Sequence, residues 1–161
     1  MVVSPPDWLI IALNVVIWFA WTVGVGYVGH RIPVERFATD SWLTQLRGFE
    51  RDGRWYEQRL RIKAWKDRLP EAGAFFGGGF SKRTVRRSDL ARYLVETRRA
   101  ESVHWNAMAL APLFAIWNPP WAMVVIAVYA VGANVPCLLV QRYNRARLTR
   151  ILSIGEPAPA R

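Results

Sequence analysis

Apolar side chains are concentrated in three stretches of the chain, and two of these stretches are long. Residues 8–29 contain only two clearly polar side chains, and residues 121–140 contain only Asn134 apart from the amphipathic Tyr129. A helix needs about 20 residues to cross the hydrocarbon core of a bilayer. The pattern therefore predicts a membrane-spanning helix in each of these two stretches.

The third apolar run, residues 105–117, is too short to cross a bilayer easily. It is followed by Asn118-Pro119-Pro120, and prolines stop a helix because they lack the backbone N–H and fix the backbone. The pattern predicts a helical hairpin in which a short or re-entrant second span, residues 104–117, is joined by a tight turn to the last span.

Lysine and arginine are confined to two regions of the chain. Residues 31–99 hold 17 of the 22, the last 20 residues hold the other 5, and none lies before Trp8 or in the Pro119-Pro120 turn. Basic residues favour the cytoplasmic side of a membrane. We therefore expect an all-α membrane protein of one domain, residues 1–161, in the bacterial cytoplasmic membrane. Its N-terminus and hairpin tip lie outside, and residues 30–103 and the tail, 141–161, lie in the cytoplasm.

Other classes fit the composition less well. A cleaved signal peptide is disfavoured because no basic residue precedes the first apolar run, which is longer than a signal core. The single Cys137 excludes a disulfide framework. The net charge of +10 suggests nucleic acid, but basic residues that flank spans are better explained by anionic lipid headgroups.

The segment 30–103 combines aromatic and basic residues, as expected of a surface that lies on lipid headgroups. Within it, residues 56–64 alternate charged and apolar positions, although their residue types favour a helix, and we expect an interfacial helix. Residues 73–82 are rich in Gly and Phe without the order of a phosphate-binding loop. They are interpreted as a loop with Phe anchors or as a gate over an acyl-chain entrance.

Helical spacing runs from Ser88, a potential N-cap, into the short span. Glu101 and His104 share one otherwise apolar stripe of this helix, three residues apart. Ionisable groups at a membrane boundary are costly unless paired, and a carboxylate beside an imidazole is a common way to orient a general base. The alternative is a polar cap that seats the helix at headgroup depth.

The last helix carries a matching polar stripe that includes Asn134, Gln141 and Arg145. An Asn inside a span needs a partner on another helix or a ligand. The neighbouring arginines, Arg142 and Arg147 among them, either attract anionic lipid or hold a phosphate or carboxylate through their planar guanidinium groups.

Three blocks of residues resemble the glycosyl-4,4'-diaponeurosporenoate acyltransferase family, which completes staphyloxanthin-type carotenoids. They are Glu96-Thr97-Arg98-Arg99-Ala100-Glu101 with His104-Trp105, Ala133-Asn134-Val135-Pro136, and residues 140–148. Arg31-Ile32-Pro33 and Trp65-Lys66 also fit, so that the resemblance covers most of the chain.

The resemblance implies transfer of a fatty acyl group to a hydroxyl of a glycosylated carotenoid or related glycolipid. An acyl thioester such as acyl-CoA would be the co-substrate, with no metal or bound redox cofactor. We expect His104 to act as general base on the sugar hydroxyl and Glu101 to orient it. The residues expected to line the facing helix or hold the donor's phosphates are Asn134, Gln141, Arg142, Arg145 and Arg147.

Two other classes remain open on the sequence. One is a different intramembrane enzyme, of the methyltransferase or reductase type, whose polar stripe would hold a nucleotide cofactor. The other is a noncatalytic membrane adaptor that recruits a partner through its basic surface.

Overall fold

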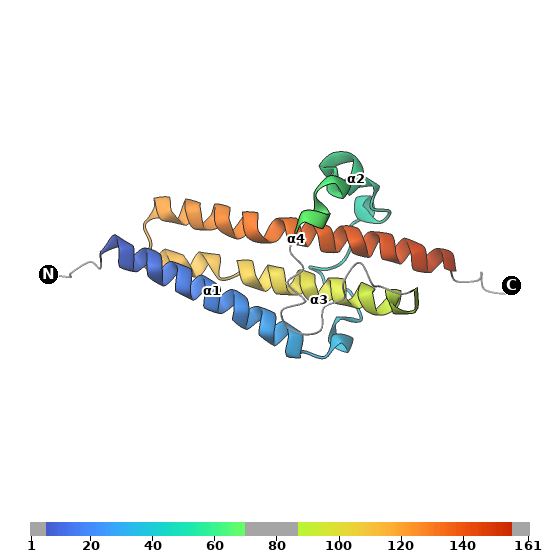
Figure 1. Cartoon of the computed structure of the whole chain (residues 1–161), viewed down its shortest axis with the longest axis horizontal. Helices are drawn as coiled ribbons and strands as arrows, with labels where there is room; N and C mark the ends of the chain where they lie inside the picture. Colours follow the sequence, from blue (N-terminus) through green and yellow to red (C-terminus); the bar gives the residue numbers. More distant parts are fainter. Residues whose placement is uncertain (1–5, 70–86, 156–161) are drawn as a thin grey trace.

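The structure, a computed structural model, describes residues 6–69 and 87–155, and in these two ranges every regular element is a helix. The α-helices are α1 (Asp7–Arg31), α2 (Arg54–Leu60), α3 (Leu90–Met108) and α4 (Pro120–Gly155). Figure 1 shows α1, α3 and α4 lying lengthwise beside one another, while α2 sits on the side of α4 that faces away from α3. The all-helical class expected from the sequence is confirmed.

Short 3₁₀-helices connect these elements. They are η1 (Val34–Phe37), η2 (Gly48–Glu50), η3 (Ile62–Ala64), η4 (Lys66–Arg68), η6 (Arg87–Asp89) and η7 (Ala111–Ile116).

Among the described residues, two helices, α1 and α4, are long and apolar enough to cross a membrane. The expected short span over residues 104–117 is not one continuous helix, because α3 ends at Met108 and the chain continues as η7. Pro112 lies in the first turn of η7 and has no N–H to extend the α-helical hydrogen bonds of α3. The three-span topology therefore stays a prediction.

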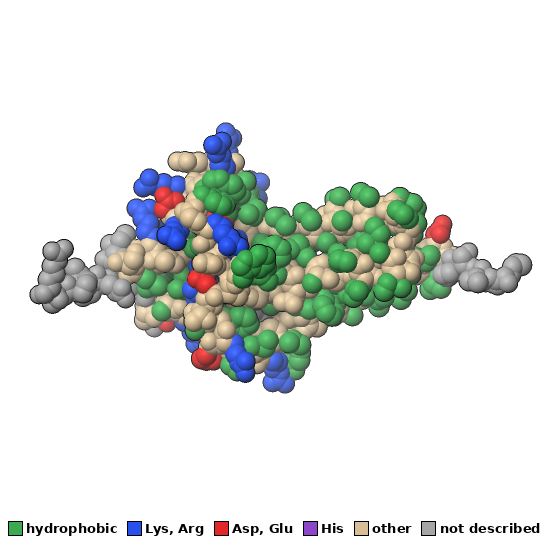
Figure 2. Space-filling view, turned by 180° about the vertical axis from the view of Figure 1, so that it is seen from behind, with side chains coloured by type: hydrophobic (Ala, Val, Ile, Leu, Met, Phe, Trp, Pro, Cys, Tyr) green, Lys and Arg blue, Asp and Glu red, His purple; other side chains and the backbone are tan. Residues whose placement is uncertain are grey.

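Charge is segregated along the length of the molecule. In Figure 2, apolar side chains cover one half, and the Lys and Arg side chains gather at the other end. Exposed residues of the apolar half include Ile11, Val15 and Phe19 on α1 and Val124 and Val128 on α4. Such a large apolar surface is unfavourable in water and is suited to lipid contact.

Helix α1 is held to the hairpin at both of its ends. Near its start, the side-chain amides of Asn14 and Asn118 exchange hydrogen bonds of 2.7 and 3.1 Å, and Trp117 Nε1 donates to Asn14 Oδ1 at 2.7 Å. Near its end, Gly29 lies so close to α3 that an added Cβ would be 2.5 Å from Val103 Cγ2. Both the amide nitrogen and the amide oxygen of Asn14, a polar residue of the first predicted span, thus help to hold the helices together.

The α2 region packs on α4 through aromatic side chains. Tyr56 and Ile62 are buried against Tyr143 and Val140. Gly53, which has the positive φ of 76° that only glycine adopts readily, precedes α2 and allows this close approach.

Helix α2 is shorter than the interfacial helix expected over residues 56–64. It ends at Leu60 because Arg61 takes the left-handed conformation, with φ 46°, and η3 follows. This turn directs Ile62 into the core, where it is fully buried.

Two further expectations concern the region before α3. Ser88 does not cap this helix: residues 87–89 form η6, the helix begins at Leu90, and Ser88 Oγ donates to Asp89 Oδ1 instead. The Gly- and Phe-rich stretch 73–82 lies outside the described residues.

Candidate active site

Polar side chains are buried where α3 packs against α4. Thr97 and Glu101 on α3 and Asn134 and Arg145 on α4 are at most 6% exposed, and Glu50 from η2 joins them at 4%. Buried polar groups are costly unless they are paired. Thr97 donates to the Leu94 carbonyl of its own helix, and the pairing of the others divides them into two separate groups.

The first group joins His104 on α3 to Asn134 on α4. His104 Nδ1 lies 3.0 Å from Asn134 Oδ1, and Asn134 Nδ2 donates to the Ala130 carbonyl at 3.0 Å. Because the amide N–H of Asn134 is used by its own helix, its Oδ1 must accept from the imidazole. This fixes the proton of neutral His104 on Nδ1 and leaves Nε2 with a free lone pair, as a general base requires.

Glu101 does not orient His104, contrary to the expectation from their spacing. Its carboxylate accepts from Arg142 Nη1 at 2.6 Å, Arg145 Nη2 at 2.5 Å and Trp105 Nε1 at 3.3 Å. Three residues of separation on a helix places two side chains near each other but does not decide which partner each one takes. Two guanidinium groups on α4 attract the carboxylate more strongly than a neutral imidazole, and Asn134 takes the orienting position.

The second group is an ion cluster formed by Glu50, Glu101, Arg142 and Arg145. Arg142 bridges the two acids, with Nη2 2.6 Å from Glu50 Oε2, and also donates to the carbonyls of Leu43 and Gln45. Arg145 donates to the Thr44 carbonyl as well as to Glu101. The ion cluster thereby holds the segment before α2 against α3 and α4.

Glu50 is the member of the ion cluster that the sequence did not single out. Tyr56 Oη and the Arg47 N–H donate to it alongside Arg142. Burial alone would raise the pKa of Glu50, but these hydrogen bonds outweigh burial and lower it to about 2. Its partner Arg142 is 92 residues away in the chain, and no local pattern predicts such a pairing.

The ion cluster changes the interpretation of Arg142 and Arg145 as substrate-binding residues. The cluster contains two acids and two bases and so has no net charge left for a phosphate. Arg145 retains two buried nitrogens, Nε and Nη1, with no hydrogen-bond partner among residues 6–69 and 87–155. The arginines therefore stabilise the fold here, and their binding of substrate stays a prediction.

The other two expected binding residues lie apart. Gln141 is half-buried on α4, and within the described parts of the chain its side chain makes no hydrogen bond. Arg147 is exposed, with its guanidinium 5.7 Å from the centre of the Tyr143 ring. No three His, Cys, Asp or Glu side chains in residues 6–69 and 87–155 are grouped to hold a metal ion.

The sequence relationships decide the family. Residues 39–154 match the sequence profile of the glycosyl-4,4'-diaponeurosporenoate acyltransferases, a stretch that includes every residue of both polar groups. The chain belongs to this family. Relatives given that name in Staphylococcus aureus strains bovine RF122 and USA300 are 29% identical over 151 residues, which covers 91% of this chain and 84% of each relative.

This family membership makes the chain an acyltransferase. No solved structure matches it. Acyl transfer to a hydroxyl needs a base near the reacting oxygen, and the pairing of His104 with Asn134 is compatible with such a base.

Proposed function

We propose that this acyltransferase esterifies a sugar hydroxyl of a glycosylated carotenoid, or of a related glycolipid, with a fatty acyl group from a thioester. The observation that carries the proposal is the His104–Asn134 hydrogen bond, which leaves Nε2 of a neutral imidazole free. The names of the Staphylococcus aureus relatives supply the acceptor class.

In the proposed reaction the sugar hydroxyl attacks the thioester carbonyl while His104 Nε2 accepts the hydroxyl proton. The tetrahedral intermediate collapses, the carbon–sulfur bond breaks, and the imidazolium returns the proton to the leaving thiolate. The products are an ester and a free thiol. Asn134 accepts from Nδ1–H throughout and stabilises the imidazolium that forms between the two steps.

The proposed site lies near the cytoplasmic end of the last span. Asn134 precedes Val140, the last apolar residue of that stretch, by about 9 Å of helix. Gln141 follows on the same face about two turns later and is suited to bind sugar hydroxyls at headgroup depth. With the basic end in the cytoplasm, the lipid acceptor enters from the bilayer and an acyl-CoA donor from the cytoplasm.

The test is expression of the chain in a host that makes a glycosylated carotenoid, followed by mass spectrometry of the lipid extract. Wild type should add one acyl group, and His104→Ala should reduce the acylated product by about 100-fold or more. His30→Ala, the other histidine, is the matched control and should retain product. Wild-type amounts of product from His104→Ala, at equal protein level, would refute the general-base role.

Asn134 is proposed as a positioning residue, and its test needs a second measurement. Asn134→Leu removes the acceptor of Nδ1–H, so that the imidazole is no longer held with Nε2 free. The kcat should fall with little change in KM, whereas Asn134→Asp should retain most of the kcat and shift the pH profile upwards, because a carboxylate stabilises the imidazolium. Equal loss of kcat in the two variants would contradict the positioning role.

Lipid analysis of the same host also distinguishes the acceptors and the competing classes. Acylation of another glycolipid in place of the carotenoid would change the acceptor but leave the reaction unchanged. A noncatalytic adaptor predicts function that survives His104→Ala and is lost when the basic surface is reversed in charge. A nucleotide-dependent methyltransferase or reductase predicts a mass change other than that of an acyl group.

A further inference from the structure

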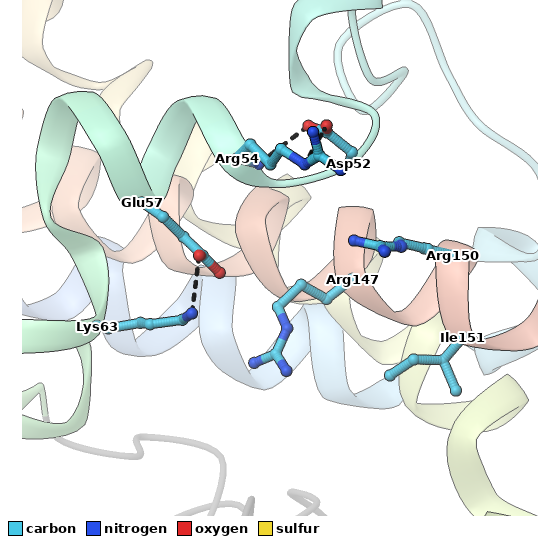
Figure 3. A pocket seen from close by; sticks show the side chains of 7 residues that line it. All are labelled: Asp52, Arg54, Glu57, Lys63, Arg147, Arg150 and Ile151. Carbon is cyan, nitrogen blue, oxygen red and sulfur yellow. Dashed lines mark hydrogen bonds and ion pairs between the residues drawn. The ribbon is translucent and has the colours of Figure 1, made fainter.

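A cavity of about 440 Å³ lies between α2 and α4, on the side of α4 away from α3. Figure 3 shows the side chains that line it: Arg147, Arg150 and Ile151 from α4, Arg54 and Glu57 from α2, and Asp52 and Lys63 from the chain on either side of α2. The cavity does not touch the ion cluster or His104, so neither of the two polar groups at the α3–α4 interface uses it.

The cations of this cavity differ in how they are paired. Arg54 is 3.2 Å from Asp52, and Lys63 is 2.7 Å from Glu57. Arg147 and Arg150 have no carboxylate of the described residues within 4.0 Å. The lining therefore carries two more positive than negative charges.

Glu57, the acid of α2 that lines the cavity, is already engaged. Both oxygens of Glu57 are used, because Tyr143 Oη donates to one at 2.8 Å and Lys63 binds the other. The bond from Lys63 lowers the pKa of Glu57, so that it stays ionised, and burial followed by the bond to Glu57 raises the pKa of Tyr143 to about 12. The acids in the cavity are thus neutralised, and the charge of Arg147 and Arg150 is left over.

We infer that this cavity is a phosphate-binding site, with Arg147 and Arg150 as the principal ligands and Arg54 and Lys63 beside them. A phosphate monoester carries a charge of about −1.5 to −2 near neutral pH and the phosphodiester of a lipid headgroup carries less, so the excess positive charge of the lining attracts either group. Guanidinium groups bind phosphate oxygens through two parallel hydrogen bonds, and Arg147 is already held over the Tyr143 ring.

The phosphate has two candidate sources, a membrane lipid headgroup and the nucleotide part of the acyl donor. Arg147 follows Asn134 by about 20 Å along α4 and lies on the α2 side of that helix, whereas Asn134 faces α3. A donor bound here would have to reach around α4 with its pantetheine arm, while a lipid headgroup would need no such path. Only the assignment of the phosphate to the acyl donor rests on the proposed function. Binding of either probe can be measured without acyl transfer.

The experiment measures binding to the full-length protein purified in neutral detergent. One arm titrates coenzyme A, with pantetheine as the phosphate-free control, and the other titrates phosphatidylglycerol against phosphatidylcholine. Arg147→Gln/Arg150→Gln should weaken binding of one of the two phosphate-bearing probes by about tenfold or more, since the charge-assisted hydrogen bonds of both guanidinium groups to the phosphate are lost. Arg36→Gln/Arg59→Gln removes the same charge from exposed positions outside the cavity and should leave binding unchanged.

Each outcome decides the inference. Loss of coenzyme A binding assigns the site to the donor, and loss of phosphatidylglycerol binding assigns it to the membrane. Equal weakening of binding in both double variants would show a nonspecific charge effect and would overturn the site. Unchanged binding of both probes in Arg147→Gln/Arg150→Gln would also overturn it. A failure of acyl transfer with intact coenzyme A binding would reject the proposed function and leave this site standing.

Discussion

Replacement of Glu101 by Gln should destabilise the protein strongly, and the loss should be reversed by a second substitution. Glu101 is fully buried and Arg145 is 1% exposed, with 2.5 Å between their charged groups. In Glu101→Gln, Arg145 is left buried without a carboxylate. Breaking a buried ion pair in this way costs about 3–5 kcal/mol, which corresponds to a fall in Tm of roughly 10 °C for a chain of this size.

The double variant Glu101→Gln/Arg145→Gln removes both charges and leaves Glu50 and Arg142 as a neutral pair. It should therefore lose much less stability than the two single changes would together, with a coupling energy of about 1–3 kcal/mol. The measurement is thermal unfolding of the four proteins of the cycle in one detergent. Additive losses would refute the interpretation of the ion cluster as a self-neutral structural unit.

The same four proteins test whether Glu101 takes part in the chemistry. If its role is to hold α3 on α4, acyl transfer should recover in the double variant together with folding. If Glu101 acts on His104 or on the substrate, the double variant should fold and remain inactive. Activity and unfolding measured on the same samples distinguish the two roles.

Three further substitutions test separate contacts. Gly29→Ala should cost about 1–3 kcal/mol because its Cβ would lie 2.5 Å from Val103 Cγ2, and Val103→Ala in the same chain should restore stability in thermal unfolding. Gly53→Ala should cost about 1–2 kcal/mol, since φ is 76° there, and a loss below 0.3 kcal/mol would contradict this conformation. The depressed pKa of Glu50, about 2 against an ordinary value of 4.5, contributes stability that is present above about pH 4.5 and lost as the pH falls towards 2. The loss should be on the order of 3 kcal/mol in acid unfolding and absent in Glu50→Gln.

The apolar helices were the most predictable part of the fold. Long runs without charge, such as residues 8–29 and 121–140, have few alternatives to a buried or membrane-spanning helix. The break in the helix over residues 104–117 has a local cause, since Pro112 converts the end of the run to a 3₁₀-helix. The helix expected over residues 56–64 is too long, because nothing in the sequence shows that Arg61 takes a left-handed conformation and ends α2 at Leu60.

The candidate site was predictable in its members but not in its pairings. His104, Asn134 and Glu101 each stand out as polar groups on otherwise apolar helical faces. Which of them meet depends on the axial register of α3 against α4, and helical periodicity carries no information about that register. The pairing with Glu50 depends in addition on a segment without regular pattern, which reaches α4 through 3₁₀ turns.

Three groups of polar or charged side chains lie along α4: the His104–Asn134 pair, the ion cluster and the cavity lined by Arg147. They differ in the lone pair or net charge that remains after their internal pairing, and this difference indicates their roles. Asn134 holds the His104 imidazole so that Nε2 keeps its lone pair. The ion cluster has no net charge, and the cavity at Arg147 has an excess of positive charge. A lone pair suits proton transfer, a neutral cluster suits packing, and excess charge suits an anion. Substitutions in the three places should accordingly alter different quantities, namely kcat at His104, the free energy of unfolding at Glu101, and phosphate affinity at Arg147.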